Sequence, residues 1–104
     1  MATRDDRKRW ARAFVIGSLE RDGNKCVFCD STKSITVYHI SGCYDLPNGA
    51  YSVSNGISVC PKHRNLCTSY HGTGKYIPEY HPRELYKLIN SSIENARKDC
   101  INLV

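Results

Sequence analysis

The sequence predicts a small α+β domain that is held together by a zinc ion and has a helix at each end. Helical periodicity predicts helices over residues 4–22 and 82–101. A short run of alternating β-branched residues over 35–40 predicts a strand between them. The pairs Cys26-Val-Phe-Cys29 and Cys60-Pro-Lys-His63 have the spacing of the two halves of a four-ligand zinc site.

The length and the cysteine content bound the class of protein. A chain of 104 residues favours one domain spanning 1–104, and a structural metal would stabilise so small a core. The N-terminus is charged and shows no secretory signal, and no segment approaches the roughly 18 apolar residues of a membrane span. We therefore expect an intracellular protein, cytoplasmic or nucleoid-associated, that makes no membrane contact. Its six cysteines would then stay reduced, which favours zinc over disulfides.

The first predicted helix begins with Thr3 and Asp6, which resemble a capping box, and it stops at Gly23. Two neighbouring rows of apolar residues predict one buried face of this helix. One row contains Trp10 and Phe14, and the other contains Ala11, Val15 and Leu19. The basic residues of the helix, at positions 4, 7, 8, 9 and 12, are expected on its other side. That basic side is either a solvated surface or a phosphate-contacting surface.

The next elements follow in order along the chain. Cys26 and Cys29 form a tight knuckle that can bind one tetrahedral ion at about 2.3 Å per sulfur, and their alternative role is that of two buried thiols. After the strand at 35–40 comes a turn-rich segment, and Tyr51 and Val53 start a second predicted strand. Residues 57–59 predict a further extended run, which leads into Cys60.

The second half of the chain is predicted to be mostly helical. Pro61 suits the first position of a short helix over 62–71 that ends at Gly72, and residues 76–81 are expected to form a loop. Pro82 then starts the final helix, whose core-facing residues are Leu85, Leu88, Ile89, Ser92, Ile93, Ala96 and Cys100.

Three ordered motifs within residues 20–72 resemble the HNH nuclease family. They are Arg21-Asp-Gly with the Cys26 and Cys29 knuckle, Thr36-Val-Tyr-His39-Ile40, and Asn55-Gly-Ile-Ser-Val-Cys60 with His63. The resemblance implies the ββα-metal fold, in which a hairpin and a helix surround the metal, here with flanking N- and C-terminal helices. It also implies a nuclease that cuts DNA, or sometimes RNA, with one divalent ion such as Mg²⁺.

The resemblance assigns a role to each matching residue. His39 matches the general base that takes a proton from the attacking water, and Asn55 matches the middle asparagine that fixes the loop and helps to orient the base. Cys26, Cys29, Cys60 and His63 match the structural zinc ligands of many members. An alternative is that Cys67 or Cys43, and not His63, is the fourth zinc ligand.

Two positions depart from the pattern of the family. Tyr38 and Arg64 occupy the places where the ligands of the catalytic ion usually fall. His71 and Asp45 are candidate substitute ligands, and Arg64 could contact a phosphate and partly replace the charge of the cation.

Two functions from different classes remain open at this point, and a third is weaker. The first is an HNH-like endonuclease or nickase acting on nucleic acid, most simply DNA. The second is a catalytically degenerate zinc module that binds nucleic acid or a protein partner without cleavage, and the third is a zinc adaptor with no nucleic-acid role. A net charge of +5 and a pI of about 9.0 agree with a nucleic-acid partner. We assign that contact to Arg21, Lys25, Lys62 and Arg64, and a homodimer on duplex DNA is a further expectation.

Overall fold

The computed structural model describes residues 2–69 and 74–104, and it has the predicted α+β class. The helices of the described residues are α1 (Arg4–Arg21), α2 (Pro61–Cys67), α4 (Pro82–Leu88) and α5 (Ile93–Ile101). Strands β1 (Thr36–His39) and β2 (Gly56–Val59) form an antiparallel pair. Short 3₁₀ turns lie at Asn48–Ala50, Val53–Asn55 and Pro78–Tyr80.

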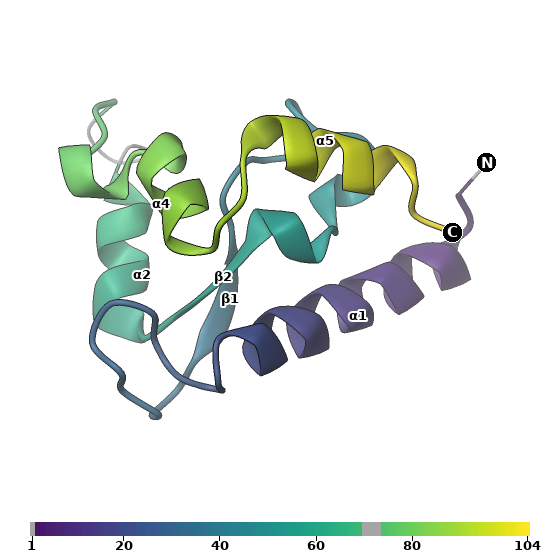
Figure 1. Cartoon of the computed structure of the whole chain (residues 1–104). Coiled ribbons are helices and arrows are strands. Elements are labelled where there is room, and N and C mark those ends of the chain that lie inside the picture. Colours follow the sequence, from purple (N-terminus) through teal and green to yellow (C-terminus); the bar gives the residue numbers. More distant parts are fainter. Residues whose placement is uncertain (1, 70–73) are drawn as a thin grey trace.

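The hairpin lies at the centre of the molecule. Helix α1 runs along one side of it, α5 lies on the other side, and α2 and α4 lie together at one end (Figure 1). The register pairs Thr36 with Val59 and His39 with Gly56, so His39 ends β1 where β2 begins. Every residue of β2 is buried, because helices and turns cover this strand. In the part of the chain that the structure describes, no helix is both long enough and apolar enough to cross a bilayer.

Helix α1 has the predicted capping box, but only one of its two predicted apolar rows is buried. Trp10 and Phe14 face the core and Ser18 is fully buried, whereas Val15 is 42% exposed. The cause is a close approach of the helix to the start of β2. A Cβ atom added to Gly56 would lie 2.7 Å from Cε2 of Phe14, and it would also meet the hydroxyl of Ser18. Small residues are therefore required where the helix crosses the hairpin.

The predicted single C-terminal helix is wrong, since the chain forms two helices with a break at residues 89–92. Asn90 has a φ of 54°, a left-handed conformation that a helix interior does not allow. The side chain of Ser92 accepts a hydrogen bond from the N–H of Asn95 and so starts a new helix. The break changes the direction of the chain, and Leu88, which was predicted to face the core, is 51% exposed.

Three other predicted elements are corrected. Tyr51 and Val53 do not begin a strand, because the chain turns through Val53–Asn55 before β2 starts. The predicted loop over 76–81 contains the turn Pro78–Tyr80. Helix α2 ends at Cys67 with Thr68 as its cap, so it is shorter than the predicted 62–71. Residues 70–73, which include His71 and the predicted stop at Gly72, lie outside the described residues.

Candidate functional site

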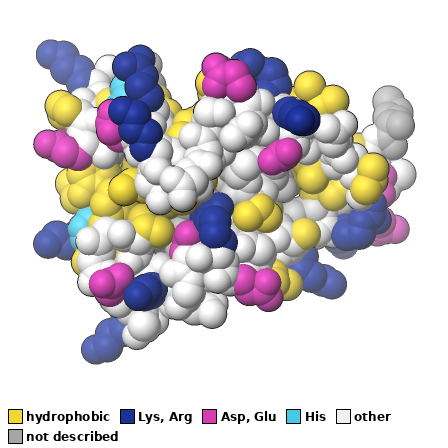
Figure 2. Space-filling view, viewed as in Figure 1, with side chains coloured by type: hydrophobic (Ala, Val, Ile, Leu, Met, Phe, Trp, Pro, Cys, Tyr) yellow, Lys and Arg dark blue, Asp and Glu magenta, His cyan; other side chains and the backbone are white. Residues whose placement is uncertain are grey.

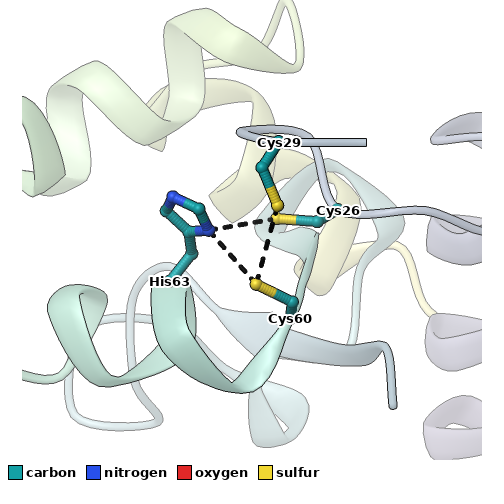
Figure 3. Close-up of side chains that lie close together, drawn as sticks. All are labelled: Cys26, Cys29, Cys60 and His63. Atoms are coloured by element: carbon teal, nitrogen blue, oxygen red, sulfur yellow. Dashed lines mark hydrogen bonds between the residues drawn. The ribbon is translucent and has the colours of Figure 1, made fainter. Parts of the chain in front are cut away.

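The two predicted ligand pairs come together at one end of the hairpin. The side chains of Cys26, Cys29, Cys60 and His63 converge on one point, and their ligand atoms all lie within 4.8 Å of one another (Figure 3). Nδ1 of His63 lies 3.1 Å from Sγ of Cys60 and 3.7 Å from Sγ of Cys26, and Sγ of Cys29 lies 3.8 Å from Sγ of Cys60. This cluster can bind a metal such as zinc.

The spacing of one sulfur pair in the cluster matches that of a tetrahedral zinc site. With zinc–sulfur bonds of about 2.3 Å, two sulfur atoms at a tetrahedral site lie about 3.8 Å apart. The separation between the Cys29 and Cys60 sulfur atoms has this value. The donor set of three thiolates and one imidazole is the one that structural zinc sites use, and it leaves no position open for a substrate.

Local hydrogen bonds position the four ligands. The knuckle is closed by bonds from Cys26 N–H to the Ser31 carbonyl and from Asp30 N–H to the Cys26 carbonyl, both 2.9 Å. Cys60 caps the N-terminus of α2, so that His63 stands one helical turn further on. The backbone N–H and then the ring of His63 lower the pKa of Cys60 to about 6, which favours the thiolate that a metal needs.

The two alternative cysteines lie outside this cluster. Among the described residues, the group that can hold an ion does not include Cys43 or Cys67. Cys43 is exposed on the loop after β1. Cys67 is buried, and burial raises its pKa to about 11, which keeps the thiol protonated.

A second group of predicted residues shares one hollow on the surface. The hollow has a volume of about 440 Å³, and its walls include Tyr38, His39, Asp45 and Arg64. The proposed base, one candidate ion ligand and the candidate phosphate-binding arginine thus face the same space. The other candidate ion ligand, His71, lies outside the described residues.

His39 is packed between aromatic rings. Its imidazole stacks on Phe14 with ring centres 4.3 Å apart and meets the edge of Tyr51 at 5.3 Å. Its Nε2 atom is buried and has no hydrogen-bond partner among the described residues. Burial, and then the charge of Arg64, lower the pKa of His39 below 6.5. The lowered pKa favours the neutral form of the ring at pH 7, which is the form that a general base requires.

Arg64 and Tyr38 are both held by the hairpin and α2. Arg64 Nη1 donates to Oγ1 of Thr36 at 3.1 Å, and its guanidinium lies 5.7 Å from the centre of the Tyr38 ring. The Tyr38 hydroxyl donates to the Cys67 carbonyl at 3.4 Å. Tyr38 is thus a packing residue, and the hollow keeps a guanidinium where the resemblance implies an ion ligand.

Asn55 is fully buried and holds the segment that follows His39. Its Oδ1 accepts hydrogen bonds from the Ser41 N–H at 3.0 Å and the Tyr86 hydroxyl at 2.7 Å. Its Nδ2 donates to the carbonyls of Ser41 at 2.9 Å and Ala50 at 3.0 Å. All four hydrogen-bonding positions of the amide are used. Because Ser41 lies two residues after His39, these bonds fix the loop beside the imidazole.

We expect the Asn55→Ala variant to lose about 3 kcal/mol of unfolding free energy, because it leaves several buried polar groups without partners. Tyr86→Phe removes the hydroxyl that bonds both Asn55 and Ser41, and it should cost about 1–2 kcal/mol. Urea denaturation followed by circular dichroism measures both values. Asn95→Ala, at an exposed position of α5, is the control and should change stability by less than about 0.5 kcal/mol. A loss at Asn55 as small as that at Asn95 would contradict the role assigned to this amide.

The four residues predicted to contact nucleic acid differ in how far their side chains are engaged by other residues of the protein. The Arg21 guanidinium donates to both carboxylate oxygens of Asp22 at 2.8 Å and to the Val53 carbonyl at 2.7 Å, so it joins α1 to the hairpin region. Lys25 pairs with Asp30 at 3.4 Å on the surface. Lys62 is exposed on the first turn of α2, and Arg64 lines the hollow. Arg21 therefore has a structural role, whereas Lys25, Lys62 and Arg64 remain candidates for the predicted contact, since the ion pair of Lys25 is exposed to solvent.

Several residues of the site gave no local signal in the sequence. Phe14 and Tyr51 pack on His39 from segments 25 residues before it and 12 residues after it. Tyr86 reaches Asn55 from α4. Their positions depend on the tertiary fold, and a pattern of neighbouring residues does not contain that information. Comparisons with protein-family models, with curated proteins and with solved structures find no match to this chain.

Proposed function

We propose that this protein is an HNH-like endonuclease or nickase that hydrolyses phosphodiester bonds of DNA. The observation that carries the proposal is the shared hollow of His39, Asp45 and Arg64. A neutral imidazole, a carboxylate and a guanidinium facing one space are the groups that phosphodiester hydrolysis needs. The elements around this hollow are an antiparallel hairpin followed by a helix, with the Cys/His cluster at their junction, and this arrangement supports the ββα-metal fold.

Each of the three residues has one task in the proposed reaction. His39 takes a proton from the attacking water, and because Nε2 is buried the accepting atom is Nδ1. Arg64 donates hydrogen bonds to the phosphate oxygens, where negative charge grows as the water attacks. Asn55 and Tyr86 hold the loop after His39 and so fix the direction of the imidazole.

A catalytic divalent ion fits the hollow through the carboxylate of Asp45. Mg²⁺ is commonly held by one or two carboxylates together with the phosphates of its substrate, so one carboxylate is sufficient here. Asp45 is exposed and lines the hollow. When bound, the ion would supply positive charge for the phosphate.

The test is plasmid nicking by the zinc-loaded protein, with and without added Mg²⁺, Mn²⁺ or Ni²⁺. We expect supercoiled plasmid to become nicked circles only with an added ion, and we expect Asp45→Asn to reduce the rate at limiting ion concentration. Glu20→Gln, a change of an exposed carboxylate in α1, is the control and should leave the rate unchanged. If duplex DNA, single-stranded DNA and RNA all stay intact while the zinc remains bound, the proposal is overturned.

A second candidate is a zinc-containing module that binds nucleic acid or a protein partner without cutting it. This function is favoured by the positions of Tyr38 and Arg64, both of which are tied to the hairpin or to α2 by the hydrogen bonds given above. Under this function His39→Ala would leave nucleic-acid binding intact, and the wild-type protein would show no cleavage with any ion.

A further inference from the structure

One face of helix α1 is apolar and buried towards its C-terminal end and basic towards its N-terminal end. Arg7, Ala11, Phe14 and Ser18 lie at helical spacing on one row, and the last two are buried against the hairpin. Towards the N-terminus the same face continues with Arg4, Arg7 and Lys8 instead of apolar residues. The sequence had suggested that the basic residues all lie on the side away from the apolar rows. The structure instead places three of them on the extension of the core-facing side.

This basic part of α1 forms one wall of a hollow of about 460 Å³. Its lining residues are Ala2, Thr3, Arg4, Arg7, Lys8, Ala11 and Tyr51. The lining contains three cations, one aromatic ring and no carboxylate. The nearby carboxylate of Asp6 is engaged by the N–H of Thr3 at 3.0 Å and by Arg9 at 2.9 Å. Figure 2 shows Lys and Arg side chains gathered over this N-terminal end of α1.

Tyr51 connects this hollow to the proposed active site. Its ring lines the basic hollow and meets the edge of His39 at 5.3 Å, and it also lies 5.9 Å from Phe14. His39 in turn lines the hollow that contains Arg64. Tyr51 in one hollow thus touches His39 in the other, and a ligand long enough to occupy both hollows would follow a path beside these two rings.

We propose that a nucleic-acid strand binds along this path, with its phosphates on Arg4, Arg7 and Lys8 and one base stacked on Tyr51. This inference rests on the proposed function, and it adds the direction in which the substrate approaches His39. The volume falls in the range of small-molecule sites, so a single nucleotide unit fits the hollow. Three cations and an aromatic face are the combination that strand-binding proteins use, since the cations bind phosphates and the ring stacks on any base.

The experiment measures the salt dependence of binding to a fluorescein-labelled 12-nucleotide strand and to its duplex, by fluorescence anisotropy without added divalent ions. The double variant Arg7→Ala, Lys8→Ala should lower the magnitude of the slope of log K against log[salt] by about 1.4 to 1.8, because two phosphate contacts are lost. Arg97→Ala, Lys98→Ala changes an equal pair of adjacent, exposed cations on α5 and should leave the slope unchanged.

Tyr51 supplies a second, charge-neutral test in the same assay. Tyr51→Leu removes the stacking surface and should weaken binding about fivefold or more, whereas Tyr51→Phe keeps the ring and should bind as the wild type does. Circular dichroism of each variant shows whether the fold is retained. If the Tyr51→Leu and Tyr51→Phe variants bind the labelled strand equally well, the stacking role of Tyr51 is overturned.

The remaining outcomes separate this inference from the proposed function. If plasmid nicking occurs but the α1 and α5 double variants have equal slopes, the nuclease stands and the binding path is overturned. If nicking fails but the α1 variant alone lowers the slope, the path stands as that of a binding module. If the protein binds anionic lipid vesicles or polyglutamate and neither oligonucleotide, the basic hollow serves another partner and the inference is overturned.

Discussion

The Cys60→Ser variant is expected to lose its bound metal and most of its folded structure at 25 °C. The apparent binding free energy of structural zinc in small domains is about 10–16 kcal/mol at pH 7. The whole unfolding free energy of a small protein is usually about 5–15 kcal/mol, so a domain of this size cannot absorb the loss. Cys60 joins the end of β2 to the start of α2, and the metal would connect both elements to the knuckle at Cys26 and Cys29. Without it, the described links that remain include one hydrogen bond from Val27 N–H to the Ser58 carbonyl and the stack of Phe28 on His63.

Far-UV circular dichroism and metal analysis by atomic emission measure the two effects together. Cys43→Ser is the matched control, because this cysteine is exposed and lies outside the cluster. We expect the control to keep one metal ion per chain and the wild-type melting temperature. If Cys60→Ser also keeps one metal ion per chain and the wild-type melting temperature, the assignment of Cys60 as a metal ligand is contradicted.

The second large effect is expected at His39. His39→Ala should lower the rate of nicking about 10²- to 10⁴-fold, because general-base catalysis contributes that much and no other described residue of the hollow is a histidine. The variant also loses the stack on Phe14, so His39→Gln, which keeps more of the side-chain volume, provides a second test with less loss of packing. Plasmid nicking at saturating ion concentration measures both variants.

His81→Asn is the control for His39. His81 caps α4 by accepting a hydrogen bond from the N–H of Arg83 at 3.2 Å, and asparagine serves this position equally well. We expect this variant to nick plasmid at the wild-type rate. Equal losses at His39 and His81 would show a general effect of replacing a histidine and would remove His39 from the mechanism.

The features that the sequence predicted correctly depend on residues close together in the chain. The spacing of Cys26 and Cys29, and of Cys60 and His63, follows from the geometry of a knuckle and of one helical turn. The start of α1 follows from the capping box of Thr3 and Asp6. Such patterns involve residues close together in the chain, so the candidate metal ligands could be proposed from the sequence without a structure.

The features that the sequence did not predict depend on contacts between distant segments or on single backbone conformations. The break at Asn90 needs one residue with positive φ, and the helical periodicity continues across it. The burial of Ser18 in place of Val15 depends on how closely α1 approaches Gly56. The basic hollow at the start of α1 exists because Tyr51 lies opposite it, and that position is set by the turn before β2.

The pH dependence of single-turnover nicking tests the role of His39 most directly. Burial and the charge of Arg64 lower the pKa of His39 below 6.5, so the neutral base is favoured at neutral pH and is lost as the pH falls through the lowered pKa. We predict a rate that reaches its plateau at neutral pH and falls at acid pH, with a midpoint below 6.5, as His39 becomes protonated. The residual activity of His39→Ala should lack this step. A step that persists in His39→Ala, or a wild-type rate that does not fall at acid pH, would contradict His39 as the general base.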